Sequence, residues 1–179
     1  AHQLERPGTT ALASANESTA PASWDASAPQ AGSGGPELPG DLVLGNGLGG
    51  FTPDGREYVL AVDRLTSTPA PWSNVLANEW FGCLVTEAGP RCTWAGNSQS
   101  RRLTSWANDP TADPATEAVF QHDAVTGRAW SLTPSPRPSG ARYLVRHAQG
   151  STSWQHEAGG WHSLLTVAVA VDAPVKLVH

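Results

Sequence analysis

The stretch TPAPWSNVLANEWFGCLVTEAGPRCTWAGNSQSRRLTSWANDPTADP, residues 68–114, decides the fold of this chain. Apolar residues alternate over 81–85 and again over 92–94, and the letters EAGP at 87–90 separate the two runs. A period of two on both sides of a Gly-Pro dipeptide predicts two antiparallel strands, with Gly-Pro at the tip of the turn that joins them. The centre of the chain is therefore expected to be a β-hairpin.

The two cysteines of the chain, Cys83 and Cys92, lie at nearly equal distances from this turn. Their placement predicts that they face each other across the hairpin. They would then form a disulfide in an oxidising compartment or, as we favour, remain two small buried apolar residues. Neither cysteine has a CxxC partner or a histidine at ligand spacing, so we expect no metal site.

The rest of the sequence also alternates short apolar runs with turn residues. Further strands are predicted, in chain order, at 41–44, 58–62, 118–120, 129–132, 141–149, 151–156, 161–171 and 175–178. Three prolines within 133–140 predict a surface loop there. No segment of about a dozen residues carries a helical stripe with caps. The predicted class is therefore all-β, an antiparallel β-sandwich.

Two parts of the chain differ in composition. Residues 1–40 are rich in Ala, Ser, Thr, Pro and Gly, and they hold few large apolar side chains. Such a segment buries too little surface to offset its ordering entropy, so we interpret it as a flexible linker or arm. Residues 41–179 are expected to form the sandwich domain. The chain contains no methionine, even at position 1, which suggests a processed or excised piece of something longer, or an incomplete sequence.

Charge and hydropathy exclude several functions. The net charge of −5, without basic runs, argues against nucleic-acid binding. The longest apolar run, 164–171, is too short to cross a bilayer. A GxGxxG pattern at 45–50 follows a short apolar run, but a second turn follows it instead of a helix. We therefore expect no dinucleotide and no other cofactor, and we assign these glycines to a tight connection between strands.

Tryptophans and short polar residues occur together on both sides of the hairpin. Trp72 is followed by Ser73 and Asn74, and Trp106 precedes Asn108 and Asp109. A pyranose offers an apolar face that stacks on indole and hydroxyl groups that need placed donors and acceptors. The pattern therefore favours sugar binding. The alternative, that these tryptophans are core residues of a β domain, stays open at this point.

Several blocks of the chain, in the same order, resemble one known family. They are NGLGGFTPDGREYV at 46–59, TPAPWSNVLAN at 68–78, FGCLVTEAGPRCTWAGNS at 81–98, RLTSWANDPTADP at 102–114, TGRAWSLTP at 126–134 and YLVRHAQG at 143–150. These blocks are similar to the N-terminal β-sandwich of glycoside hydrolase family 94, the cellobiose-phosphorylase-type enzymes. Within the family, the resemblance is greatest to cyclic β-1,2-glucan synthases and β-1,2-oligoglucan phosphorylases. The sequence departs from the family pattern at Cys83, Cys92, Gln99 and Ser105.

The resemblance implies a sandwich of the super-sandwich type, which we expect to be incomplete at the C-terminus of this chain. It also implies a catalytic (α/α)6 barrel that is absent here, and inverting phosphorolysis of a β-glucoside with inorganic phosphate as co-substrate and no metal. We therefore expect no catalytic residue in this chain. We expect a cytoplasmic protein, attached to the inner membrane if the parent is a synthase, and an open sheet edge that favours a homodimer.

The binding candidates come from the tryptophan blocks and from blocks that match the family. The first group is expected to form one sugar surface, and it comprises Trp72, Asn74, Trp94, Asn97, Arg102, Trp106 and Asp109. The second group is Arg146, His147 and Gln149. Three interpretations follow: a non-catalytic sandwich of a β-glucan enzyme, a stand-alone carbohydrate-binding module, or an interaction domain without a ligand.

Overall fold

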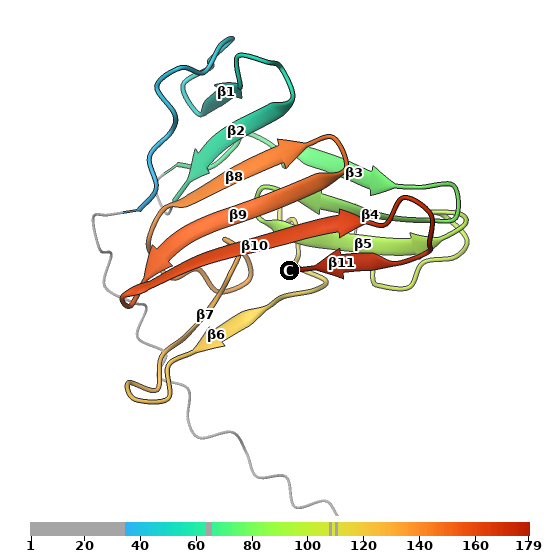
Figure 1. Ribbon diagram of the computed structural model, residues 1–179. Coiled ribbons are helices and arrows are strands. Elements are labelled where there is room, and N and C mark those ends of the chain that lie inside the picture. The colour runs from blue at the N-terminus through green and yellow to red at the C-terminus, as the bar shows by residue number, and fades with distance from the viewer. Residues whose placement is uncertain (1–34, 64–65, 108, 110) are drawn as a thin grey trace, which may run out of the picture.

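A computed structural model describes residues 35–63, 66–107, 109 and 111–179 (Figure 1). No helix occurs in these ranges, so none that could cross a membrane is present there. The predicted arm lies mostly outside the described residues. The strands, in chain order, are β1 (Gly49–Phe51), β2 (Glu57–Val62), β3 (Ser73–Ala77), β4 (Phe81–Thr86), β5 (Gly89–Ala95), β6 (Phe120–His122), β7 (Ala129–Ser131), β8 (Tyr143–Ala148), β9 (Ser151–Ala158), β10 (Trp161–Val169) and β11 (Lys176–Val178). The predicted all-β class is confirmed.

Six strands form the larger sheet, in the order β1-β2-β8-β9-β10-β11, and every neighbouring pair is antiparallel. Residue pairing aligns Leu60, Val145, Trp154 and Leu165 in one row across four strands. All four side chains are at most 3% exposed. Because side chains alternate between faces along a strand, this row defines the inner face of the sheet.

Three strands form the smaller sheet, in the order β3-β4-β5. Figure 1 shows it behind β8, β9 and β10 of the larger sheet. Leu76, Cys83 and Val85 of the smaller sheet belong to the same core cluster as the buried row of the larger sheet. The two sheets therefore pack face to face around one core, which is the predicted sandwich.

The hairpin predicted from the central stretch is the β4–β5 pair, but two of its details were wrong. Thr86 pairs with Gly89, so the tip is Glu87-Ala88, and Pro90 lies within β5 opposite Val85. Cys83 pairs with Thr93 rather than with Cys92. Both cysteines are free and buried. The two cysteines lie on opposite faces of the sheet. Cys83 faces the core, as does its partner Thr93, and side chains alternate along a strand, so Cys92 faces the other side.

The segment 133–140 is free of strands, as predicted, but it is not a simple surface loop. Thr133 is fully buried and Ser139 is 2% exposed. The Tyr143 hydroxyl accepts a hydrogen bond from Ser139 N at 3.0 Å and donates one to Ser131 O at 3.0 Å. Polar groups that are hydrogen-bonded in this way can be buried without a large energetic penalty. The prolines of the segment therefore predicted correctly that it forms no strand, but not that part of it is buried.

Residues 41–44 do not form the predicted strand. Only an isolated bridge joins Val43 to Phe51 of β1. The glycine-rich segment that follows leads into β1, where Gly49 lies against the backbone of β2. A Cβ at Gly49 would stand 2.2 Å from Val59 O, so this close strand contact requires glycine.

Candidate functional site

Two hollows lie on opposite faces of the smaller sheet, and together they hold most of the candidate residues. The first, named here the inter-sheet pocket, has a volume of about 360 Å³ and is lined by Asn46, Tyr58, Trp72, Ser73, Asn74 and His147. The second, named the outer hollow, has a volume of about 430 Å³ and is lined by Leu84, Cys92, Trp94, Asn97, Ser98, Gln99, Arg102 and Trp106. Both volumes suit a small ligand.

The opposite placement follows from strand register. Asn74 pairs with Val85, whereas Trp94 pairs with Gly82. Val85 faces the core, and Gly82 lies an odd number of positions away along β4, so it faces outward. The expectation of one continuous sugar surface was therefore wrong.

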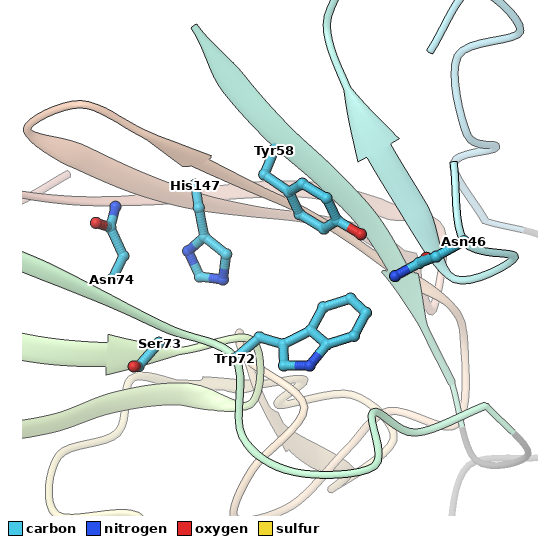
Figure 2. A pocket seen from close by; sticks show the side chains of 6 residues that line it. All are labelled: Asn46, Tyr58, Trp72, Ser73, Asn74 and His147. Atoms are coloured by element: carbon cyan, nitrogen blue, oxygen red, sulfur yellow. The ribbon is translucent and has the colours of Figure 1, made fainter. Parts of the chain in front are cut away.

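The inter-sheet pocket lies where β2 and β8 face the start of β3. Figure 2 shows Tyr58 and His147 projecting from the larger sheet toward Trp72 and Ser73, with Asn46 entering from the loop before β1. Tyr58 and Trp72 meet edge to face, with ring centroids 5.6 Å apart. The two rings form an apolar wall, and no charged side chain belongs to the lining.

A buried carboxylate holds Trp72 in place. Trp72 N donates to Glu87 Oε2 at 2.7 Å, and Glu87 N donates to Trp72 O at 3.3 Å. The Thr68 hydroxyl also donates to Glu87, and Trp154 Nε1 donates to Glu87 O at 2.8 Å. Burial raises the pKa of Glu87, and the hydrogen bonds from Thr68 and Trp72 oppose that rise. Glu87 is therefore part of the scaffold behind the pocket.

The amide group of Asn74 connects the two sheets. Its Nδ2 donates to Ala148 O at 2.8 Å, to Ser151 O at 3.2 Å and to Thr152 Oγ1 at 3.1 Å. These acceptors surround the turn between β8 and β9. The donor group predicted for a sugar is thus engaged within the protein.

His147 is neutral in the folded state. Burial lowers its pKa to about 4, and a weaker interaction with the Trp72 backbone opposes that shift. Its Nδ1 lies 3.0 Å from Thr152 Oγ1, while Nε2 is buried without a hydrogen-bond partner. Since the Thr152 hydroxyl already accepts from Asn74, it satisfies both neighbours by donating to Nδ1, which places the ring proton on Nε2.

The outer hollow is an aromatic surface stiffened by a local turn. The Trp94 indole lies over Gly82, where a Cβ would stand 2.5 Å from the ring. The Arg102 guanidinium lies 4.4 Å from the centroid of the Trp106 ring, which is a cation–π contact. Arg102 Nε donates to Ser98 O at 2.9 Å, and Asn97 Oδ1 accepts from Gln99 N at 2.8 Å.

Three candidates lie in neither hollow. Asp109 accepts hydrogen bonds from the backbone N–H groups of residues 111 and 112, at 3.0 and 2.9 Å, as a turn-capping carboxylate does. Arg146 is ion-paired with Glu57, with 2.9 Å between Nη1 and Oε2. Gln149 is exposed in the turn after β8. No test of ligand binding bears on any candidate, so their roles stay predictions.

Asn46, Tyr58 and Ser73 are lining residues that sequence reasoning missed. Asn46 was assigned only to the glycine-rich connection, where its Oδ1 does accept from Leu48 N and Gly49 N at 3.1 Å. Tyr58 belongs to a predicted strand, and its alternation with Leu60 was the signal that it faces inward. The described residues contain no group of three or more His, Cys, Asp or Glu that could hold a metal.

Comparison with known proteins gives a consistent result. Residues 56–179 match the family Glycosyl hydrolase 94, supersandwich domain. The chain is similar to cyclic beta-(1,2)-glucan synthase NdvB of Rhizobium meliloti (strain 1021), with 40% identity over 148 residues, 78% of this chain and 5% of that protein. It is also similar to N,N'-diacetylchitobiose phosphorylase of Vibrio proteolyticus, with 27% identity over 68% of this chain and 15% of that protein. The phosphorylase of Vibrio furnissii gives 27% identity over 63% of this chain and 14% of that protein. The chain thus spans a small part of each relative.

Proposed function

Because this chain belongs to the glycosyl hydrolase 94 supersandwich family, we propose that it is the non-catalytic sandwich portion of a longer enzyme that phosphorolyses or transfers β-linked glucans. The observation that carries this proposal is the 40% identity to a cyclic beta-(1,2)-glucan synthase over 78% of the chain. That similarity favours β-1,2-glucan as the substrate type. The proposal includes a cytoplasmic location for this portion.

The state of the carboxylates supports a non-catalytic role. Inverting cleavage needs a carboxylic acid placed at the scissile bond, with its pKa raised. Burial does raise the pKa of Glu87, but this residue is 6% exposed and lines neither hollow. Asp113 is held by Arg91, whose Nε lies 2.6 Å from Asp113 Oδ1. Glu117 is paired with Lys176.

The outer face of the smaller sheet is the surface that we propose packs on the catalytic (α/α)6 barrel. Val75, which pairs with Leu84 of the outer hollow, is 60% exposed, and Trp106 is 48% exposed. Large apolar side chains gathered on one face favour a protein contact. The outer hollow would then add Trp94 and Arg102 to the wall of a sugar site, or to a contact with a second copy.

The activity test uses the open reading frame that contains this segment. We expect the longer protein to release glucose 1-phosphate from a β-1,2-glucooligosaccharide in the presence of inorganic phosphate. The 179-residue chain alone is expected to release none. Release by the isolated chain would overturn the non-catalytic role. Absence of both phosphorolysis and glucosyl transfer by the longer protein, on β-linked glucans generally, would overturn the enzyme class.

A second candidate function is a stand-alone carbohydrate-binding module. The solvent-exposed Arg102–Trp106 pair beside Trp94 favours this function. The indole rings can stack on the apolar face of a sugar, and the guanidinium can donate hydrogen bonds to its hydroxyl groups. For this function, β-1,2-glucooligosaccharides should quench the tryptophan fluorescence of the isolated chain saturably. Trp106→Ala should remove that quenching.

A further inference from the structure

The inter-sheet pocket is separate from the face that the proposed function uses. Its residues come from the inner face of the larger sheet, from β3 and from the loop before β1, whereas the outer hollow lies across β4 and β5 on the other side. A ligand in one hollow is therefore separated from a ligand in the other by the thickness of the smaller sheet. The two hollows can be tested independently.

The polar groups of this pocket fall into two classes. Asn74 Nδ2 and Asn46 Oδ1 are used within the protein, by the β8–β9 turn and by the glycine-rich loop respectively. Among the described residues, no hydrogen bond is found for Tyr58 Oη, Trp72 Nε1, Ser73 Oγ or Asn46 Nδ2, and His147 Nε2 has no partner. These groups are mainly donors. Figure 2 shows Tyr58 Oη and Asn46 on one side of the Trp72 indole and His147 on the other, whereas the Ser73 hydroxyl points away from the two rings.

The chemistry of the lining narrows the ligand. All six lining side chains are neutral, because burial keeps the imidazole of His147 uncharged. A phosphate or carboxylate would find no cation to compensate its charge, and desolvating such an ion is costly. An aliphatic ligand would leave the unused donors unpaired. A ring with one apolar face and several hydroxyl groups satisfies both the aromatic wall and the donors.

We propose that the inter-sheet pocket is a second binding site, which takes a single neutral pyranose unit against the Tyr58–Trp72 wall. The occupant is either a free hexose or the terminal residue of a glucan, since both present the same ring. This site lies outside the proposed catalytic role and does not need the barrel. Its failure is therefore distinguishable from failure of the phosphorolysis test on the longer protein.

The experiment titrates the isolated chain with glucose, methyl β-glucoside and a β-1,2-glucotriose, while the indole N–H signal of Trp72 is followed by NMR. Ligand efficiencies typical of small molecules place the expected Kd at about 1 mM. Saturation by glucose alone identifies a free-hexose site, and saturation also by the two glycosides identifies a terminal residue. Either result supports the proposal. No shift for any sugar at about ten times that concentration overturns it.

Two conservative variants localise the effect. Tyr58→Phe removes one hydroxyl and keeps the wall, and Asn46→Asp keeps the Oδ1 acceptor of the loop while it removes the amide donor. Each is expected to raise Kd by about 2- to 10-fold, as loss of one hydrogen bond does. Val125→Ala, at an exposed turn position that lines neither hollow, is the control and should leave Kd unchanged. The proposal is overturned if Tyr58→Phe and Asn46→Asp both bind like the parent, or if inorganic phosphate shifts the Trp72 signal as the sugars do.

Discussion

Replacing His156 by phenylalanine should flatten the dependence of folding stability on pH. His156 is fully buried and stacks on Tyr143, with ring centroids 4.5 Å apart and the planes inclined by 16°. Neither ring nitrogen has a hydrogen-bond partner. Burial lowers the pKa of His156 from its ordinary value of 6.5 to about 4. Phenylalanine keeps the stacked ring and removes the titration.

The sign and size follow from proton linkage. Below pH 6.5 the unfolded chain gains a proton on this imidazole, while the folded chain stays neutral until pH 4 is approached. Stability is therefore lost as pH falls through this window, and no more is lost below the folded pKa. Between about pH 7 and pH 5 the linkage relation gives a loss of about 2 kcal/mol for this one group.

Urea unfolding followed by tryptophan fluorescence measures this loss at several pH values. His147 titrates in the same direction, and the raised pKa of Glu87 acts in the opposite direction, so the comparison must be between variant and parent. His156→Phe should lose about 2 kcal/mol less than the parent between about pH 7 and pH 5. Gln155→Leu, at the exposed β9 position next to His156, changes no titratable group, so it is the control and should follow the parent. Equal losses in His156→Phe and the parent would refute the argument from burial.

Three further predictions concern the smaller sheet. Asn78→Ala removes two hydrogen bonds from Nδ2, at 2.8 and 2.7 Å, to backbone carbonyls near the β10–β11 turn, and two that Oδ1 accepts from Trp80 N and Phe81 N at 2.8 Å, and it should cost about 2–4 kcal/mol in urea unfolding. Gly82→Ala should displace the Trp94 indole and cost about 1–3 kcal/mol, seen as a red shift of emission; an unshifted spectrum would contradict the close contact. The Cys83 thiol, whose pKa burial raises to about 11, should react with a thiol reagent only as fast as the chain unfolds, and a faster reaction in native buffer would contradict its burial.

Periodicity predicted the strands well because most of them have one buried face. The β9 strand alternates between buried and less buried positions from Thr152 to His156, and this is the pattern from which a strand is inferred. Turn positions were harder to predict. The Gly89-Pro90 dipeptide is typical of a turn, yet it lies inside β5, where Gly89 pairs with Thr86 and Pro90 with Val85, and a register shift follows between Val85 and Cys83.

The division of the candidates between two hollows was beyond the reach of the sequence. Trp72 and Asn74 lie close in sequence to Trp94, and nothing in their spacing tells which face each will occupy. The face is set by which residue lies opposite on the neighbouring strand, and register depends on turn length and on bulges. The register shift within the β4–β5 pair is such a feature, and no pattern in the sequence predicted it.

The polar residues of the central stretch show why proximity to tryptophan is a weak guide to ligand contact. Asn74 and Asn78 each lie two residues from an indole in the sequence, and each connects distant backbone segments, as the Glu87 carboxylate does through Trp72 N. A buried amide or carboxylate that lost those partners would destabilise the fold, so these groups are committed to it. The better guide is the set of donors that the fold leaves unused. By that measure Tyr58 and Trp72, whose Oη and Nε1 make no hydrogen bond within the part of the chain that the structure describes, are stronger candidates for a ligand than the asparagines.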